Sequence, residues 1–148
     1  MILETERLFL REMRQNDFRD LAEILQNPNV MYAYEHDFSE DDVQVWLDRQ
    51  IDRYKKYGFG LWAVILKNTN EMIGQAGLTI QPYKNAEVLE IGYLLKERFW
   101  HCGYAREAVN GCKKYAKVAE SVGMSKEDEF ITQYYNGDML HYLYSIRK

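Results

Sequence analysis

The sequence predicts a single domain, residues 1–148, of the α+β (mixed α/β) class. Its 148 residues are 47% hydrophobic and 28% charged and include only two prolines, a composition typical of one globular domain with its own core. The periodicity of the apolar residues gives elements in the order βααβββαββ, which mixes consecutive strands with strands separated by helices. No internal repeat or low-complexity tract interrupts this order.

Two helices are expected in the first 60 residues, each with its own start signal. Asn16 or Asp17 provides an N-cap for the first helix. Ser39 begins the second, where Asp42 three residues later completes a capping box, and Gly58 ends it. The apolar stripes at helical spacing are Phe18, Leu21, Ile24 and Leu25 in the first helix, and Val43, Trp46, Leu47, Gln50 or Ile51, and Tyr54 in the second.

Four strands are expected in the first two thirds of the chain, at residues 4–11, 61–66, 72–80 and 87–95. In the first of them, alternation places Leu8 and Leu10 on one face. The polar residues 68–71 predict a turn and residues 82–85 a loop. Gly92 inside the fourth strand indicates a β-bulge or a close approach to the backbone.

The last third of the chain predicts one helix and a hairpin. A helix from about Tyr104 keeps its apolar phase as far as Val122, and Gly123 is a natural stop. Residues 130–135 and 139–147 have the pattern of two strands, joined by a turn that contains Asn-Gly.

The net charge limits the classes of partner. A formal charge of −4 argues against nucleic acid, which needs a basic face, and is compatible with an amine substrate. No apolar run is long enough to cross a bilayer, and the first residues lack the pattern of a secretory signal. We therefore expect a cytoplasmic protein with no nucleic-acid or membrane partner.

The cysteines and histidines give no metal-binding pattern. Cys102 and Cys112 form no CxxC pair, which favours free thiols in a reducing compartment. His36, His101 and His141 are scattered along the chain. No zinc site, and no other metal site, is therefore expected.

Residues 90–108, EIGYLLKERFWHCGYAREA, are the most informative segment. They predict a buried strand, a loop that contains Gly103, and the start of a helix. Unpaired backbone N–H groups and the positive end of a helix dipole suit such a position to a phosphate. The loop lacks the lysine and the glycine density of a P-loop and is not GxGxxG. From the residues alone, a plain connection between strand and helix remains the alternative.

This segment resembles the acetyl-CoA-binding region of the GNAT superfamily of N-acetyltransferases. The signature of that region is Gln or Arg, two residues, Gly, one residue, then Gly or Ala; here Trp100 stands at its first position, Gly103 at its glycine and Ala105 at its end. Phe-Trp before the loop and Gly-Tyr-Ala after it are similar to the branch that acetylates ribosomal-protein N-termini, including the ribosomal-protein-alanine acetyltransferases. The fragments ETERLFLRE, NPNVM, MIGQAGL and HYLYSI resemble the same branch in the same order.

The resemblance implies a GNAT-like domain over residues 1–148, with a central, mostly antiparallel sheet flanked by helices. It also implies acetyl-CoA as co-substrate and no metal. The pantetheine arm is expected to pair like an extra strand with Tyr93, Leu94 and Leu95, and a backbone N–H near Tyr93 or Leu94 to polarise the thioester carbonyl. The pyrophosphate is expected on the amides of His101, Cys102, Gly103, Tyr104, Ala105 and Arg106.

In this family the acetyl group passes directly to an amine, so no cysteine nucleophile is needed. Glu90 is our candidate base, because it projects from the strand that carries the acetyl group; a structural acid is the alternative. Tyr134 and Tyr135 are open between the acceptor pocket and the core. The acidic residues of 35–42 lie where relatives shape the acceptor site, although helix-start acids and a solvated loop also explain them.

The resemblance breaks after Ala116. Relatives leave the helix there, add a strand and enter a further helix, whereas Lys117 here continues with what resembles the end of that later helix. The sequence thus indicates an internal deletion of about 20 residues and one missing late strand. The terminal hairpin then has three options: to close against the central strand, to fill the coenzyme groove, or to exchange with a second chain in a homodimer.

Two functions follow from these observations. The first is an N-acetyltransferase that acts on a protein N-terminus or a small amine. The second is a catalytically impaired remnant that binds CoA or serves as an interaction module. The intact segment 90–108 favours the first and the missing strand favours the second. Ribosomal-protein N-termini, polyamines, aminoglycosides and amino acids all remain open as acceptors.

Overall fold

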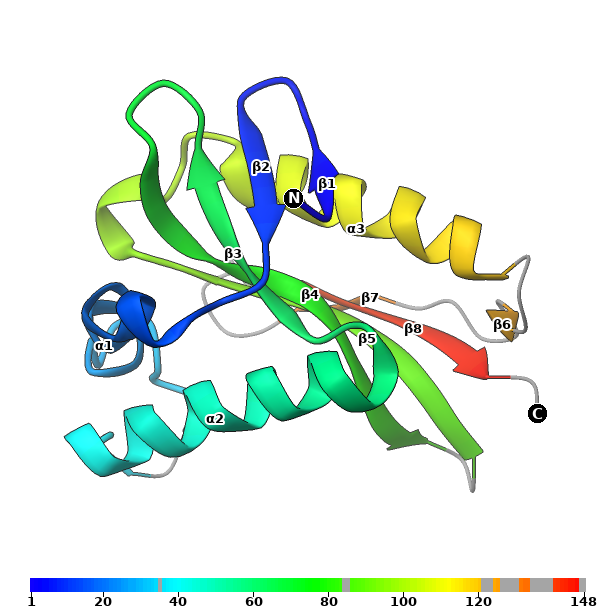
Figure 1. The fold of residues 1–148 in the computed structure, drawn as a ribbon, viewed down its shortest axis with the longest axis horizontal. Helices are drawn as coiled ribbons and strands as arrows, with labels where there is room; N and C mark the ends of the chain where they lie inside the picture. The colour runs from blue at the N-terminus through cyan, green and yellow to red at the C-terminus, as the bar shows by residue number, and fades with distance from the viewer. Residues whose placement is uncertain (35, 84–85, 121–123, 126–130, 134–139, 147–148) are drawn as a thin grey trace.

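The computed structural model of this protein describes residues 1–34, 36–83, 86–120, 124–125, 131–133 and 140–146. One sheet runs through the molecule in the order β1-β2-β3-β4-β5-β8-β6, with β7 also paired to β8. Helices α1 and α2 cover one face of the sheet and α3 covers the other (Figure 1). Every pairing between the described strands is antiparallel. The predicted α+β class with a mostly antiparallel sheet is confirmed.

The helices are α1 (Phe18–Leu25), α2 (Glu40–Tyr57) and α3 (Tyr104–Glu120), with short 3-10 turns η1 (Gln15–Asp17) and η2 (Glu97–Phe99). The strands are β1 (Leu3–Glu4), β2 (Leu8–Arg11), β3 (Leu61–Leu66), β4 (Glu71–Tyr83), β5 (Ala86–Leu95), β6 (Met124–Ser125), β7 (Ile131–Gln133) and β8 (Leu140–Ile146).

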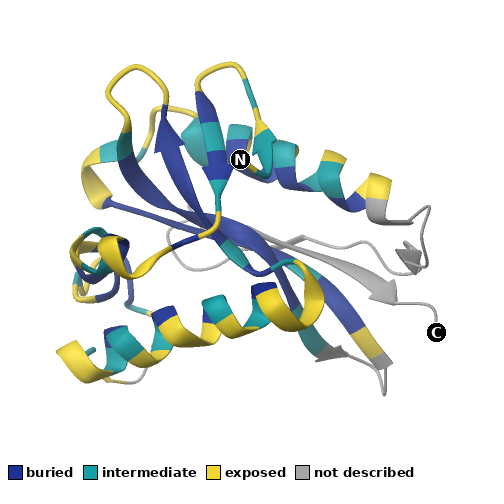
Figure 2. Cartoon of the chain, viewed as in Figure 1, coloured by how far each residue is buried: buried dark blue, intermediate teal, exposed yellow. Residues whose placement is uncertain are grey.

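Two apolar cores lie on opposite faces of the sheet, because alternate strand residues point to opposite sides. On the α3 side, Trp62 and Val64 of β3 pack with Leu8 and Leu10, which share one face as predicted. On the other face of the sheet, Ala63 and the residues on its side of β3 pack against α1 and α2. The buried strands stand out between the exposed outer helix surfaces (Figure 2). Burial on both faces explains why β3 reads as an almost continuous apolar run.

The capping signals of α2 are confirmed. The Ser39 hydroxyl accepts from the Asp42 N–H at 3.1 Å, and the Ser39 N–H donates to the Asp42 carboxylate at 3.0 Å. The bond from the Ser39 N–H to the Asp42 carboxylate, followed by hydrogen bonding of the Ser39 side chain to it, holds the pKa of Asp42 below its usual value. Gly58 ends the helix with φ of 79°.

The predicted strand at residues 4–11 is wrong in one respect, since the structure folds it into a hairpin. Thr5 turns the chain by donating its N–H to the Leu8 carbonyl at 2.8 Å, so that Leu3 pairs with Leu10. A three-residue reversal is too short to interrupt the apolar alternation, so the pattern conceals it.

The predicted loop at residues 82–85 needs correction, and of the two alternatives for Gly92, a bulge or a close approach to the backbone, the first is wrong for the pairing of β5 with β4. Pro82 and Tyr83 belong to β4 rather than to a loop at residues 82–85. The register of β4 with β5 runs without interruption past Gly92, which pairs with Gly77, so this ladder has no bulge there. The irregularity lies instead between β3 and β4, after Val64.

At the C-terminal end, α3 continues without a break across the junction after Ala116, as expected for one fused helix. The predicted hairpin is confirmed as the antiparallel pair β7 and β8, while its turn at residues 134–139 lies outside the described residues. The two-residue strand β6 was not predicted. Of the three options for the hairpin, the structure has β8 closed against the central strand β5. Homodimerisation by strand exchange stays a prediction, which a measurement of size in solution tests.

Candidate active site

A cavity of about 240 Å³ lies between α2 and the sheet. Its floor is the α2-facing side of β4 and β5, where Thr79 is paired with Glu90 and Gln75 with Leu94. Between these pairs Gly92 contributes no side chain, which leaves room in the floor. The cavity therefore brings together Glu90, Tyr93 and Leu94, three of the residues that the sequence predicted for the site.

Three side chains spaced one turn apart fasten α2 to the sheet, and two of them, Trp46 and Gln50, also line the cavity. Trp46 Nε1 donates to Gln75 Oε1 at 3.0 Å. Gln50 Oε1 accepts from the Leu61 N–H at 3.1 Å, and the Tyr54 hydroxyl donates to the Leu61 carbonyl. Buried polar groups that are paired in this way fix the position of a helix as well as add stability.

The two strands paired with β5 extend along it to different points within the described residues. The register of β5 with β8 runs from Val88 to Ile91, whereas its register with β4 continues to Leu95. Toward Leu140, β8 pairs instead with β7. A strand edge beyond the end of a described ladder is the kind of position at which an extended ligand can pair, as in β-strand addition.

The loop before α3 has an unusual backbone. His101 and Gly103 both have positive φ, 63° and 83°. The first helical hydrogen bond of α3 runs from the Glu107 N–H to the Gly103 carbonyl at 3.1 Å, so the amides of residues 104–106 have no acceptor within the helix. These amides and the helix dipole together suit the loop to an anion.

Arg7, which the sequence analysis did not single out, holds this loop. Its Nη1 donates to the Cys102 carbonyl at 3.0 Å, its guanidinium stacks over the Tyr104 ring at 4.4 Å, and its Nε donates to Glu107 Oε1 at 2.7 Å. Burial opposes the ionisation of Glu107, but hydrogen bonds from Thr5 and Arg7 outweigh it and hold the pKa of Glu107 below its usual value. The β1–β2 turn thus fixes the shape of the loop.

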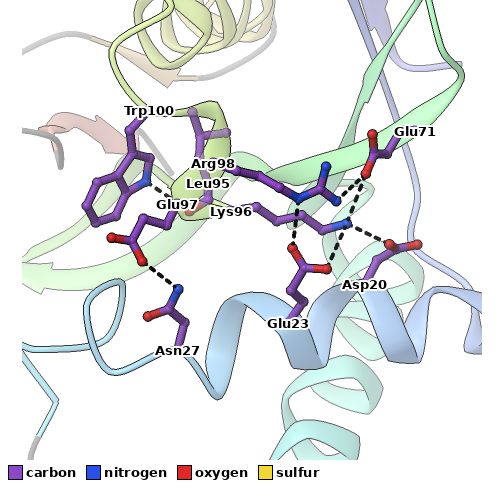
Figure 3. A network of polar contacts seen from close by, with 9 residues as sticks. All are labelled: Asp20, Glu23, Asn27, Glu71, Leu95, Lys96, Glu97, Arg98 and Trp100. Carbon is purple, nitrogen blue, oxygen red and sulfur yellow. Dashed lines mark hydrogen bonds and ion pairs between the residues drawn. The ribbon is translucent and has the colours of Figure 1, made fainter.

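A buried lysine anchors the other end of the same loop (Figure 3). The side chain of Lys96 is 1% exposed, and its Nζ lies 2.7 Å from Asp20 Oδ1 and 3.7 Å from carboxylate oxygens of Glu23 and Glu71. The side chain of Arg98 reaches the same two glutamates. The end of β5 is thereby tied to α1 and to the start of β4.

We expect Lys96→Met to lower the free energy of unfolding by roughly 2 kcal/mol. Loss of one partner from a buried ion pair costs about 3–5 kcal/mol, and the cost is smaller here because the carboxylates are 31–48% exposed. Urea denaturation measures the change. The matched control is Lys67→Met, whose ion pair with Glu4 is more exposed and should contribute under about 1 kcal/mol. Equal losses in the two variants would contradict the anchoring role.

The cysteines differ sharply in their environment. Cys102 is exposed in the loop, whereas Cys112 is buried in the α3 core, and burial raises the pKa of its thiol to about 12. Cys112 therefore stays protonated near neutral pH and is no nucleophile. Among the described residues no group of three or more His, Cys, Asp and Glu side chains is placed to hold a metal ion. In the same part of the chain, no helix has both the length and the apolar character to span a membrane.

The remaining predicted site residues lie apart from the cavity. Leu95 lies at the end of β5, where its carbonyl accepts from Trp100 Nε1 at 3.0 Å, and residues 101–106 form the loop and the first turn of α3. Of the acidic residues in 35–42, Glu35 falls outside the described residues and Asp37 lines a different hollow. Tyr134 and Tyr135 are likewise outside the described part of the chain.

Sequence reasoning missed two of the residues that line the cavity from α2. Arg49 and Arg53 line it beside Trp46, at helical positions on the same side. The available signal was the spacing of Arg49 and Arg53 at i and i+4, directly beside the stripe that contains Trp46 and Gln50.

The fold and the site define a class of protein: an α+β domain with a cavity over its central strand β5 and a loop with positive φ angles before α3. A family model described as the acetyltransferase (GNAT) domain matches residues 7–134. The chain therefore belongs to the GNAT family of N-acetyltransferases, and the resemblance seen in the sequence is confirmed.

Two curated relatives from Bacillus subtilis (strain 168) agree with this family. The chain is 37% identical to YkkB over 114 residues, which cover 76% of this chain and 66% of YkkB. It is 27% identical over 127 residues to YoaA, whose name describes it as an N-acetyltransferase; this match covers 84% of the chain and 70% of YoaA. The chain thus spans about two thirds of the length of these relatives.

Solved structures show the same fold. The acetyltransferase from Agrobacterium tumefaciens str. C58 superimposes with a TM-score of 0.70 at 22% identity, covering 96% of this chain and 92% of that chain. The ribosomal-protein-S5-alanine acetyltransferase from Vibrio fischeri gives a TM-score of 0.51 at 23% identity, covering 97% and 94%. At these sequence identities, the similarity supports a shared fold and no statement about substrates.

Proposed function

We propose that this protein is an acetyl-CoA-dependent N-acetyltransferase that moves the acetyl group to a primary amine by direct attack. One observation carries the proposal most strongly. The cavity follows Gly92, Tyr93 and Leu94 of β5, the stretch beyond the end of its register with β8. A coenzyme arm paired with this stretch would present its thioester at the cavity floor.

The coenzyme-binding residues proposed from the family are compatible with the geometry. The backbone of Tyr93, Leu94 and Leu95 lies beyond the last described pair of β5 and β8, which is Ile91 with Tyr142, and this supports an extended arm at this edge. The amides of residues 101–106 include three that the helix leaves without an internal acceptor, which supports a pyrophosphate at this loop. An added Cβ at Gly103 would lie 3.3 Å from Arg7 Nη2 and would narrow the loop.

The chemistry requires the bound amine to lose a proton and the thioester carbonyl to be polarised. Glu90 faces the cavity and is our proposed base, directly or through water. A backbone N–H of Tyr93 or Leu94 stabilises the negative charge that develops on the carbonyl oxygen. The amine nitrogen forms the new bond to the acetyl carbon while the bond to sulfur breaks. One proton of the attacking amine passes to Glu90, and the departing thiolate takes up a proton from solvent and leaves as the free thiol.

Titration calorimetry with acetyl-CoA tests the proposal. We expect 1:1 binding with a dissociation constant in the micromolar range, because several charge-assisted hydrogen bonds to the pyrophosphate are formed. No heat of binding up to millimolar acetyl-CoA would overturn it. Binding without acetyl transfer to any member of an amine panel would contradict the enzyme and favour a CoA-binding remnant. The same amine panel distinguishes the two acceptor classes, a protein N-terminus and a small amine.

A further inference from the structure

The wall of the cavity formed by α2 is positively charged. Arg49 and Arg53 both line it, one exposed and the other half-buried. They lie four positions apart on α2 and therefore on the same side of the helix. Within the described part of the chain, no carboxylate forms an ion pair with either guanidinium. This pairing of like charges contrasts with the net charge of −4 of the whole chain.

A hydrogen bond to a buried side chain holds the guanidinium of Arg53 in place. Its Nη1 donates to Gln50 Oε1 at 3.2 Å, and the same oxygen accepts from the Leu61 N–H at 3.1 Å. Gln50 is 1% exposed, so the sheet and the helix core fix the group that orients the guanidinium. The other N–H groups of Arg53 stay available as a fork for a carboxylate.

The surroundings of the arginines favour an anion between them. Burial of the guanidinium, followed by the like charge of Arg49, lowers the pKa of Arg53. Two cations at one wall of a cavity repel each other, and a bound anion relieves that repulsion. The nearby side chains Gln75 and Thr79 on the floor are neutral.

The opposite charge lies at the floor. Glu90 projects from β5 into the same cavity, so the cavity has a cationic wall on α2 and a carboxylate on the sheet. A molecule with an amine and an acid group complements both. At about 240 Å³ the space lies just below the usual range for ligand pockets, about 300–1,000 Å³, which limits the size of the acceptor.

We infer that the acceptor is a small primary amine that also carries a carboxylate, such as an amino acid or a short peptide with an acidic group. The carboxylate pairs with Arg49 and Arg53 while the amine lies at Glu90, beside the stretch of β5 proposed for the thioester. This inference rests on the proposed function. It disfavours polyamines and aminoglycosides, whose additional positive charges would face the two guanidiniums.

Matched substrates test this inference. The probes are straight-chain ω-amino acids from glycine to 6-aminohexanoate and short peptides that end in aspartate, each compared with its carboxamide. We expect kcat/KM for the best acid to exceed that of its amide by about 30-fold, as one or two net charge-assisted hydrogen bonds provide. Preference for the free amino acids or for the peptides identifies the source of the carboxylate. Equal rates for acids and amides, or faster acetylation of spermidine, would overturn the inference.

Substitutions in α2 test whether Arg49 and Arg53 cause the preference for the acid over its carboxamide. Arg53→Gln and Arg49→Gln should each reduce the preference for the acid about 5-fold, and Arg53→Lys should restore part of it. Lys55→Gln, which removes the same charge from an exposed position of the same helix, should leave the preference unchanged. Circular dichroism checks that each variant is folded.

Calorimetry with acetyl-CoA distinguishes a failure of the acceptor inference from a failure of the proposed function. If acetyl-CoA binds but the acids have no advantage, only the acceptor inference fails. If acetyl-CoA does not bind at all, the proposed function fails. If Lys55→Gln lowers the preference as much as Arg53→Gln does, the effect comes from the overall charge of α2, and the assignment to the cavity is wrong.

Discussion

Glu90→Gln is expected to lower kcat for acetyl transfer about 1,000-fold while leaving the dissociation constant for acetyl-CoA unchanged. A positioned general base typically contributes 100-fold to 10,000-fold, and glutamine keeps the shape of the side chain but cannot take up the proton. Because Glu90 lies at the cavity floor on the α2 side of β5, its replacement alters the acceptor side of the site. Steady-state kinetics with saturating acetyl-CoA, together with calorimetry, measure the two quantities.

The matched control is Glu87→Gln. Glu87 lies on the same strand, carries the same charge and is exposed. Its replacement should change kcat by less than 2-fold. A loss below about 5-fold in Glu90→Gln would show that Glu90 is a structural acid and that water or another group accepts the proton.

Gly103→Val is expected to weaken acetyl-CoA binding about 100-fold. Gly103 has φ of 83°, a conformation that is strongly unfavourable for a β-branched residue, so the loop must change shape to accept valine. The shift moves the amides of residues 104–106 away from the phosphates, and each lost charge-assisted hydrogen bond costs about 1.5–3 kcal/mol. Calorimetry with acetyl-CoA and with CoA reports the change.

Gly58 provides a control with the same backbone. Its φ is 79°, and no atom lies within 4 Å of an added Cβ. Gly58→Val should therefore carry a similar conformational strain at the end of α2, visible as a loss of thermal stability. Its affinity for acetyl-CoA should stay within 3-fold of the parent protein. Equal weakening in both variants would mean that general destabilisation, rather than the shape of the loop, controls binding.

The elements that the sequence predicted well depend on local interactions. The capping box of Ser39 and Asp42 and the left-handed Gly58 are formed by residues close in the chain, so their spacing alone specifies α2. The phase of α3 was predicted across the junction after Ala116 for the same reason. The short reversal at Thr5 was missed because hydrogen bonds within three residues change the backbone without changing the apolar pattern.

Features that depend on distant residues were not predictable. The pattern of residues 139–147 indicates a strand, but the choice of β5 as its neighbour depends on backbone pairing over more than 50 residues, which no local signal encodes. Arg49 and Arg53 resemble the solvated side of an amphipathic helix until the sheet is placed opposite them. Arg7 was missed likewise, because its loop partners lie about 95 residues away.

Helix α2 is attached to the sheet by side chains other than the two arginines that line the cavity, and three hydrogen bonds to β3 and β4 provide the attachment. Trp46, Gln50 and Tyr54 hold the helix in place, while Arg49 and Arg53 lie between them and do not carry that attachment. Mutations at these intervening positions can accumulate without loosening the scaffold or disturbing β5. Descendants of a common ancestor could thus acquire new acceptors by altering one helix face, and their divergence should concentrate there rather than along the strand.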